Sequence, residues 1–411
     1  MSYKVAGIDV HKKVLMAVIV DATEPDLEPV RRRFGSMNTE LRQLSGWLLA
    51  QGVQEVVMES TAQYWRPVWL ELEPHFERLH LAQAFSNRAP RGKKHDFRDA
   101  ERLARRQIAK ELTLSFVPGG EQRMWRNLTR MKTQLTKDRV RLHNQVEALL
   151  EEMRIKLSSV LSDLFGVSGL RILRALADGQ TDPQQLAALG DPQLRCTEAQ
   201  LVEALTGSSQ ALHQAMLGMH LDRLQQIDEQ IAKINQLVAA AMKPYADNVA
   251  RLAAVNGFGV DSAQQFVSEV GSQAATFSSP EELCHWVGTC PGQDESAEQN
   301  QSSRSPKGNK YLRRLLNQAA HAAVKTKGSH LQAVFRRLLP KLGYKGAIWA
   351  IAHRLCRLAW IILHRGVEFI EHGEHPNPRA RKHRAQSLTR ALRRLGYEVQ
   401  IRPMRPAAAE A

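Results

Sequence analysis

Cysteine is scarce in this 411-residue sequence, which limits how the fold can be cross-linked. The four cysteines are Cys196, Cys284, Cys290 and Cys356, and no Cys-x-x-Cys pair occurs. Neither a disulfide framework nor a zinc site is therefore expected. Cys284, His285 and Cys290 lie close together in sequence but lack a second pair of ligands, so we expect ordinary burial there.

Long apolar runs are missing as well. No uncharged apolar run reaches about 18 residues, the length expected of a membrane-spanning helix. The first residues lead directly into a predicted strand rather than into a secretory signal. With 43% hydrophobic residues and 411 residues in all, the chain can build real cores in two or three domains. We expect a soluble, cytoplasmic protein.

Acidic residues are in the minority. The chain has 57 Lys and Arg against 42 Asp and Glu, a formal net charge of +15. This balance favours a polyanionic partner, and nucleic acid is the usual one. Charge that serves only solubility is the alternative.

Residues 1–111 are predicted to form a mixed α/β domain. The run Tyr-Lys-Val-Ala-Gly-Ile-Asp-Val-His at 3–11 reads as a buried central strand. Residues 14–20 follow a tight turn and form its expected antiparallel partner. Further strands are predicted at 31–36, 55–60 and 79–84, with helices at 38–51, around 64–72 and from 96 onward.

Four carboxylates of this domain lie at the predicted ends of strands or at the start of a helix. Asp9 ends the first strand, Glu59 ends a later strand, and Asp96 and Asp99 share a face at the start of a helix. At one edge of a sheet these groups can converge, and four carboxylates in a small space need compensating cations. Two Mg²⁺ ions, or Mn²⁺, would supply the compensation and support phosphodiester chemistry.

Each acid also has a purely structural alternative. Asp9 can serve as a cap or a salt-bridge partner. Asp96 can cap its helix, and Asp99 can pair with Arg102 or Lys94. The four acids in this order indicate a metal site more specifically than any one of them alone.

Residues 112–245 are predicted to be helical throughout. Apolar residues recur near heptad spacing in two long helices, over about 120–157 and 198–242, with short broken helices between them. The pattern predicts an antiparallel coiled-coil arm that dimerises, binds nucleic acid along its basic face, or does both. A merely solvated face is the alternative. The predicted nucleic-acid contacts of the arm are Arg126, Arg130, Lys137 and Arg141.

Residues 246–372 are predicted to form a second helical domain. Two helices flank Gly257-Phe-Gly259, which is the pattern of a helix-hairpin-helix whose backbone N–H groups bind phosphate. A plain helical turn is the alternative. We predict Gly257 and Gly259 as nucleic-acid contacts.

A polar, serine-rich stretch at 286–309 is predicted to be a loop, followed by a basic helix at 310–327. Its serine hydroxyls lie in sequence beside cations that would favour attack on a phosphodiester. A plain loop is the alternative. The basic tail 373–411 is predicted to be a polyanion-binding extension that is weakly folded or ordered on binding. The predicted phosphate-binding residues are Arg304, Lys307, Lys310, Arg313 and Arg314.

The motifs together resemble a known family. In order they are Gly-Ile-Asp-Val-His-Lys, Met-Glu-Ser-Thr-Ala-Gln-Tyr-Trp, Lys-His-Asp-Phe-Arg-Asp-Ala, Gly-Val-Ser-Gly-Leu-Arg-Ile-Leu, the Gly-Phe-Gly hairpin, Gly-Thr-Cys-Pro-Gly-Gln-Asp-Glu-Ser-Ala and Lys-Gly-Asn-Lys-Tyr-Leu-Arg-Arg-Leu-Leu. Over about residues 3–365 the chain resembles the DEDD transposases of bacterial insertion sequences (the "one-ten" and "eleven-eleven" groups), relatives of the Piv DNA invertase.

The resemblance implies an RNase H-like (RuvC-like) N-terminal domain, a coiled-coil arm and a transposase domain with a nucleophilic serine. It implies an oligomer, guided by a structured non-coding RNA (a bridge or seeker RNA) that pairs with donor and target DNA. The four family acids correspond to Asp9, Glu59, Asp96 and Asp99.

The family serine corresponds best to Ser296, which would form a covalent phosphoserine link to DNA. The chain departs from the family pattern at His95, where threonine is usual, and at 297–299, where Gly-Lys and basic residues are frequent. Ser302, Ser303 and Ser305 therefore remain alternatives.

Three rival functions remain at this point. A metal-dependent junction resolvase would need only the four acids and no covalent intermediate. A sugar-kinase or actin-like ATPase would need a second strand-turn Asp with adjacent glycines, which is not found. A non-catalytic RNA–DNA binding protein would tolerate loss of all four acids.

Overall fold

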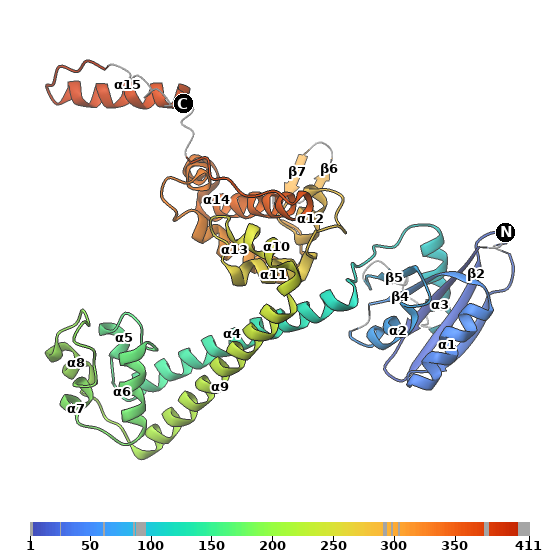
Figure 1. Ribbon diagram of the computed structural model, residues 1–411, viewed down its shortest axis with the longest axis horizontal. Coiled ribbons are helices and arrows are strands. Elements are labelled where there is room, and N and C mark those ends of the chain that lie inside the picture. The colour runs from blue at the N-terminus through green and yellow to red at the C-terminus, as the bar shows by residue number, and fades with distance from the viewer. Residues whose placement is uncertain are drawn as a thin grey trace. The chain divides into compact units, whose positions relative to one another are not determined.

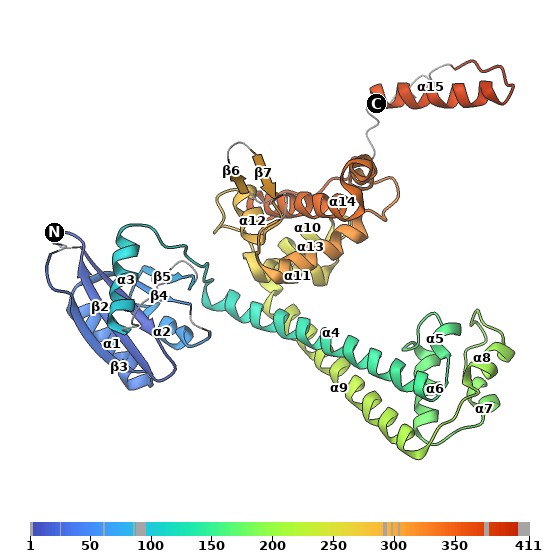
Figure 2. The same ribbon diagram turned by 180° about the vertical axis from the view of Figure 1, so that it is seen from behind.

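The computed structural model of the chain describes residues 3–24, 26–60, 62–84, 87, 96–290, 294–296, 299–302, 305–373 and 378–401. Side chains are described for all of these except 294–296, 299–302, 378–381, 383 and 384. The chain divides into two compact units, Met1–Gly119 and Gly120–Ala411, each described below by itself (Figures 1 and 2). The finer division into four parts stays a prediction.

Unit 1 is built on a five-stranded mixed sheet, so the predicted α/β character is confirmed. The strand order is β3-β2-β1-β4-β5, which places β1 at the centre. β1 runs parallel to β4 and antiparallel to β2, while β4 and β5 are parallel. The strands are β1 (Lys4–Val10), β2 (Val14–Asp21), β3 (Val30–Gly35), β4 (Val53–Glu59) and β5 (Arg78–Ala82).

The two faces of the sheet are covered by different helices. Side chains alternate along a strand, so neighbours two apart share a face. Ala6, Ile8 and Val10 pack in the core formed with α1 (Asn38–Ala50) and α2 (Trp65–Leu72). Val5 instead packs with residues of α3 (Asp96–Ile108). The odd-numbered positions of β1 therefore face α3.

Two long helices dominate the first part of unit 2. α4 (Gly120–Glu152) and α9 (Ala211–Ala241) run antiparallel and pack on each other, as Figures 1 and 2 show. Leu142, Leu224 and Ile227 form part of their shared core. The far end carries four short helices, α5 (Leu157–Val160), α6 (Val167–Ala177), α7 (Pro183–Ala187) and α8 (Glu198–Leu205).

The second long helix was predicted from residue 198, and that boundary is wrong. The chain forms α8, leaves the helix at Thr206, and starts α9 only at Ala211. Gly207 lies against the end of α4, where a Cβ would come within 2.9 Å of Ile155 Cγ1. Ser208 N–H also donates to Met153 O at 2.9 Å. This tertiary contact stabilises a break that local periodicity did not indicate.

The next helices along the chain pack together as a bundle. They are η1 (Lys243–Tyr245), α10 (Ala246–Ala253), α11 (Val260–Val270), α12 (Pro280–Val287), α13 (Lys310–Ala323) and α14 (His330–Arg365). α14 is long and apolar enough to cross a membrane by length and composition alone. It is kinked at Gly343, and 56% of its most apolar window is buried inside the protein. We interpret α14 as a core helix.

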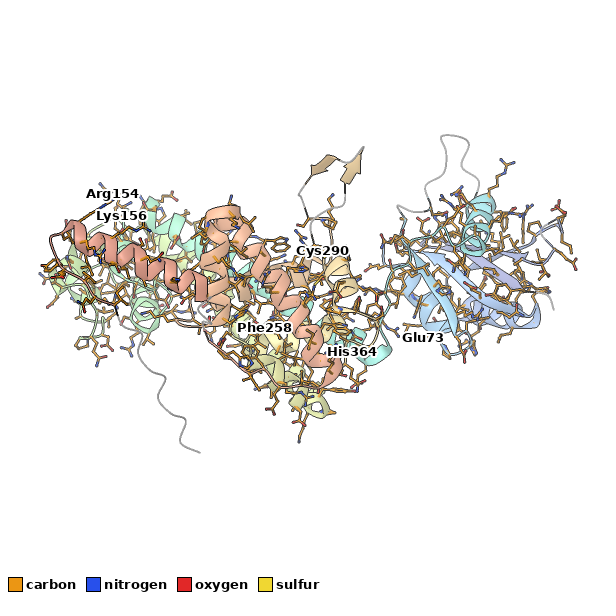
Figure 3. All side chains as sticks on the ribbon, turned by 90° about the horizontal axis from the view of Figure 1, so that it is seen from above. Glu73, Arg154, Lys156, Phe258, Cys290 and His364 are labelled. Atoms are coloured by element: carbon orange, nitrogen blue, oxygen red, sulfur yellow. The ribbon has the colours of Figure 1, made fainter. Side chains whose placement is uncertain are left out.

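Two segments predicted to be irregular contain secondary structure. The stretch 286–309, predicted as a loop, includes an antiparallel hairpin of β6 (Asp294–Ser296) and β7 (Gln299–Ser302). The tail, predicted to be weakly folded, contains α15 (Pro378–Arg394). All four cysteines are free thiols, as predicted, and Cys284, Cys290 and Cys356 are buried; Figure 3 labels Cys290, which precedes the hairpin.

Candidate metal centre and serine segment

Asp9 is a carboxylate near the end of the central strand of the sheet. It lies on the α3 face of β1 and is only 8% exposed. The parallel register pairs Ile8 with Met58, so the next residue of β4, Glu59, lies beside Asp9. Burying a carboxylate without compensation is unfavourable. We therefore expect a positively charged group or ion to lie next to the Asp9 carboxylate.

Gly7 determines how closely α3 approaches β1. A Cβ at residue 7 would overlap the carbonyl oxygen of Ala100 and lie 2.9 Å from the amide nitrogen of Ala104. Because glycine has no side chain, the helix backbone can rest directly on the strand. This contact brings the start of α3, with Asp96 and Asp99, to the strand position occupied by Asp9.

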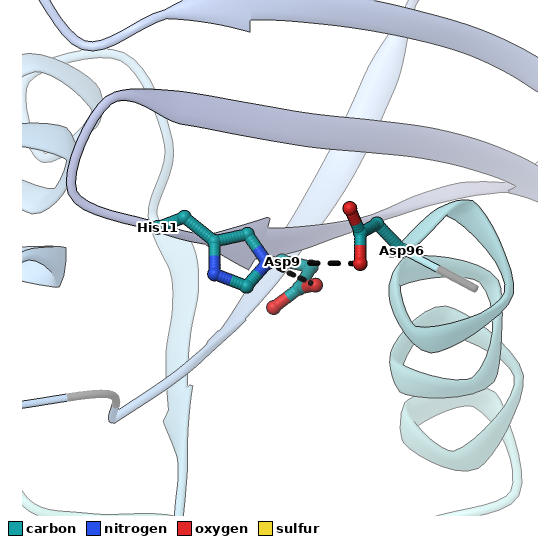
Figure 4. Close-up of side chains that lie close together, drawn as sticks. All are labelled: Asp9, His11 and Asp96. Atoms are coloured by element: carbon teal, nitrogen blue, oxygen red, sulfur yellow. Dashed lines mark hydrogen bonds and ion pairs between the residues drawn. The ribbon is translucent and has the colours of Figure 1, made fainter. Parts of the chain in front are cut away.

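The closest cluster in the site combines Asp9, His11 and Asp96 (Figure 4). His11 Nε2 lies 3.0 Å from Asp9 Oδ2 and 4.0 Å from Asp96 Oδ1. One ligand atom from each residue can be chosen so that all three lie within 4.8 Å of one another. Two carboxylates and one imidazole thus face a common point.

Burial and the neighbouring charged groups shift the pKa of Asp9. Burial raises the pKa of Asp9 above its usual value, and the negative charges of Asp99 and Glu59 raise it further. The neighbouring His11 acts in the opposite direction. All three of these residues are therefore close enough to Asp9 to interact with its charge. Glu59 and Asp99 therefore act on the same buried carboxylate, and their role as metal ligands stays a prediction.

Glu59 and Asp99 are joined by a chain of hydrogen bonds through two further residues. Asn87 Nδ2 donates to Glu59 Oε2 at 2.9 Å, and Arg102 Nε donates to Asn87 Oδ1 at 3.3 Å. Arg102 Nη2 then donates to Asp99 Oδ1 at 2.8 Å. The structural alternative for Asp99, a pair with Arg102, is thus present alongside the acidic site.

The donor set fits a divalent cation. Asp9 and Asp96 offer the carboxylate oxygens that Mg²⁺ and Mn²⁺ prefer, whereas an imidazole nitrogen is better suited to Mn²⁺ than to Mg²⁺. The raised pKa of Asp9 indicates a carboxylate whose ionised form lacks sufficient compensation. A bound divalent cation would relieve this. Asp9, His11 and Asp96 are the residues that could hold it.

Three residues of this site were not predicted as site residues: His11, Asn87 and Arg102. His11 had a usable signal, because it follows Asp9 by two residues and strand periodicity places both on one side. Arg102 was considered only as a structural partner of Asp99. Asn87 lies in an irregular stretch, and nothing in its sequence context distinguished it.

The serine segment is described only in part. Ser296 ends β6, and its side chain, like that of Ser302, lies outside the described residues. Ser303 and Arg304 lie wholly outside them. Ser305 is described, and its hydroxyl accepts a hydrogen bond from Arg313 Nη2 at 3.2 Å. The choice among these hydroxyls therefore stays a prediction.

Arg126 is not on the surface, which corrects its predicted role as a nucleic-acid contact. It is 7% exposed and donates to Ser268 O at 3.3 Å and to Glu269 O. Burial lowers the pKa of Arg126 to about 10, while the charge of Glu269 opposes the shift. Arg130 Nε and Nη2 each donate to the Glu269 carboxylate at 2.8 Å. Both arginines thus join α4 to α11 through one buried carboxylate.

Gly257 also has a structural role that differs from the one predicted. Its φ is +96°, and a Cβ there would lie 2.9 Å from Ala323 Cβ on α13. Glycine at 257 is therefore required by packing between helices. Gly259 precedes α11 in open surroundings, and its role as a nucleic-acid contact stays a prediction. Arg313 is bound to backbone carbonyls, as described below. Lys137, Arg141, Lys307 and Lys310 are exposed, and Arg314 is half-buried.

Comparison with known proteins identifies this architecture. Residues 6–155 match the DEDD transposase model of the IS110 group, described as "Transposase". Residues 249–336 match "Transposase IS116/IS110/IS902 family". The chain belongs to the IS110 family of DEDD transposases. The first match contains all four predicted acids, and the second contains the serine segment.

A relative in Pseudomonas aeruginosa agrees with this assignment. It is described as "Probable family 20 transposase" and is 28% identical over 371 residues, which cover 87% of this chain and 96% of the relative. The similarity therefore extends over the whole transposase and is not confined to one unit. The chain is a DNA transposase, an enzyme that cuts and rejoins DNA strands, and the predicted family is confirmed.

We predict that Gly7→Ala separates α3 from β1 and disables the acidic site. Overpacking of this kind costs about 1–3 kcal/mol of stability, and Asp96 would move away from Asp9. Urea unfolding and DNA cleavage measured on the same preparations check this. Gly46→Ala is the matched control, because Gly46 lies in α1 with nothing within 4 Å of a new Cβ. The control should gain roughly 0.5–1 kcal/mol and keep its activity. Full activity of Gly7→Ala would contradict the account.

A second prediction concerns Asp9→Asn, which removes one of the clustered negative charges. In EDTA at neutral pH the variant should melt at a higher temperature than the wild type, because the unfavourable ionised form is gone. Mn²⁺ should raise the melting temperature of the wild type but not that of the variant. Asp26→Asn, an exposed acid of the same unit, is the control. Equal responses of wild type and Asp9→Asn to Mn²⁺ would argue against a metal site at Asp9.

Proposed function

We propose that this transposase cleaves and rejoins DNA with a serine nucleophile, assisted by a divalent-metal site at Asp9, Glu59, Asp96 and Asp99. The observation that carries the proposal is the cluster of Asp9, His11 and Asp96, with Glu59 and Asp99 acting on the charge of Asp9. When bound there, Mg²⁺ or Mn²⁺ would stabilise charge developing on phosphate and leaving oxygen. Asp9, His11 and Asp96 are the residues that would hold the cation there.

The strand order supports an RNase H-like (RuvC-like) fold for unit 1. Three parallel strands, β1, β4 and β5, are extended by the antiparallel β2 and β3. In unit 2, the antiparallel α4 and α9 support a coiled-coil arm, and α10 and α11 around Gly257 and Gly259 support a helix-hairpin-helix. The four-part division 1–111, 112–245, 246–372 and 373–411 belongs to this proposal.

In the proposed reaction the Oγ of Ser296 attacks a DNA phosphorus. A P–Oγ bond forms, the bond from phosphorus to one strand oxygen breaks, and that oxygen takes a proton. The serine proton passes to a base. A hydroxyl of the partner strand later attacks the phosphoserine, which releases Ser296. A serine needs such help because its hydroxyl is a weak nucleophile at neutral pH.

We further propose that a structured non-coding RNA guides the enzyme to donor and target DNA, and that it works as a homo-oligomer in the cytoplasm. The net charge of +15 and the exposed Lys137, Arg141, Lys307 and Lys310 support a polyanion surface larger than one duplex requires. A junction resolvase without a covalent intermediate is not favoured, because both matched family models are of transposases.

The serine is tested by trapping. Wild-type protein incubated with labelled insertion-junction DNA and Mg²⁺ should give a covalent adduct on a denaturing gel, and Ser296→Ala should give none while binding DNA with unchanged affinity. Ser302→Ala, Ser303→Ala and Ser305→Ala are the matched variants, each removing one alternative hydroxyl. An adduct that survives in Ser296→Ala and disappears in one of these would show that another serine attacks.

RNA guidance has its own test. Protein purified from cells that carry the whole element should contain one defined RNA, and its removal by RNase should abolish site-specific DNA binding. Adding back the same RNA should restore it, whereas an RNA of equal length and scrambled sequence should not. Site-specific cleavage by RNA-free protein would exclude guidance.

A further inference from the structure

Two chain segments lead into and out of the hairpin that carries Ser296, and they pack closely against each other. We define the hairpin root as residues 286–290, which include the end of α12 and the three residues after it, and 305–309, which precede α13. Asn309 N–H donates to Trp286 O at 3.3 Å across the root. A Cβ at Gly308 would lie 2.6 Å from Gly288 N, and one at Gly288 would lie 2.6 Å from Pro306 O. Two glycines are therefore needed for the segments to approach so closely.

Arg313, one turn into α13, binds both segments at once. Its Nη1 donates to Gly288 O on the first segment and to Pro306 O, at 3.0 Å, on the second. Its Nη2 donates to the Ser305 hydroxyl at 3.2 Å. The guanidinium also lies over the ring of Trp349 at 4.5 Å from its centroid. Its donors are thus directed at the hairpin root, and its flat face is covered.

The second segment of the root is also tied to α4. Asn309 Oδ1 accepts hydrogen bonds from the backbone of Tyr311 and Leu312, which caps α13. Its Nδ2 donates to Glu269 Oε2 at 2.8 Å, and the same carboxylate holds Arg130 of α4. Glu269 is 2% exposed, so this link lies in the interior of unit 2. The root is held from both sides.

We propose that Arg313 is a positioning residue that sets the direction in which the serine hairpin leaves unit 2, and that it does not contact nucleic acid. The inference rests on the proposed function insofar as the hairpin carries the nucleophile. Rate in such a reaction depends on placement, because a displacement of about 1 Å can cost 10²-fold.

The chemistry of the contact requires arginine. A planar guanidinium presents several donors in a fixed fork and can stack on an aromatic ring, whereas a lysine ammonium is a single flexible point charge. Lysine at 313 would keep the charge but could not bind Gly288, Pro306 and Ser305 together over Trp349. A residue that acts on phosphate by charge would tolerate lysine far better. The two roles therefore predict opposite behaviour of Arg313→Lys.

The test compares Arg313→Lys and Arg313→Gln with the wild type, using the full-length protein and its copurified RNA. Arg337→Gln is the matched control, because Arg337 is an exposed arginine of α14 outside the root and the candidate sites. Hydrogen–deuterium exchange is followed in peptides covering 286–290 and 305–309. In parallel, single-turnover adduct formation and the salt dependence of binding are measured with labelled insertion-junction duplex.

We expect both Arg313 variants to exchange faster at the hairpin root than the wild type, with the α11 and α13 cores unchanged. Both should form the adduct at least about tenfold more slowly, with unchanged DNA affinity and salt slope. Arg337→Gln should match the wild type in every measurement.

Two results would overturn the positioning role. One is unchanged exchange at the root in Arg313→Gln. The other is wild-type rate in Arg313→Lys together with a salt slope in Arg313→Gln reduced by about 1, the signature of a lost phosphate contact. The exchange measurement does not depend on chemistry. If the wild type gives no adduct, the serine mechanism fails and the exchange result alone still decides the role of Arg313 at the root.

Discussion

The acidic site depends on the close packing of the α3 backbone against Gly7. Only a residue without a side chain allows the carbonyl of Ala100 to reach β1, and only this approach places Asp96 near Asp9. β1 supplies Asp9, His11 follows directly after the end of this strand, and the parallel neighbour β4 adds Glu59 at the same level. The site is thus a consequence of one strand, its register and one glycine.

In unit 2 the buried carboxylate of Glu269 determines how several helices pack. Glu269 is buried and satisfied by Arg130 and Arg126 of α4 and by Asn309 at the start of α13. A buried carboxylate that lost these partners would be strongly unfavourable, so the partners hold α4, α11 and the start of α13 in one arrangement. The start of the arm and the hairpin root are therefore joined through one buried carboxylate within unit 2.

Much of this organisation could be predicted from the sequence. Strand periodicity identified β1 and its neighbours, and Asp9, Glu59, Asp96 and Asp99 stood out because carboxylates interrupt buried or helical patterns. Charge alone was a poorer guide. Arg126 and Lys137 look alike on a basic helix, yet the first is buried against Glu269 and the second is exposed. Only the tertiary partner, 143 residues away in sequence for Arg126, distinguishes them.

Gly257 illustrates the same limit for backbone motifs. A glycine between two helices reads as a phosphate-binding hairpin, but the helix packed against it accounts for glycine equally well. The break before α9 was missed because a tertiary contact with the end of α4, rather than local periodicity, stabilises it. The hairpin β6–β7 was missed because its strands are only three and four residues long. His11 stands two residues after Asp9, a spacing that the sequence does show, but a single histidine beside a strand does not by itself indicate a metal ligand.

We propose that α3, packed on Gly7, creates a divalent-cation site at Asp9, His11 and Asp96. Anomalous diffraction from crystals of the transposase grown with Mn²⁺ tests it most directly. The account predicts an anomalous peak within coordination distance of the Asp9 and Asp96 carboxylates, lost in crystals of Asp9→Asn. Well-ordered crystals with α3 seated on β1 and no Mn²⁺ at these carboxylates would contradict it.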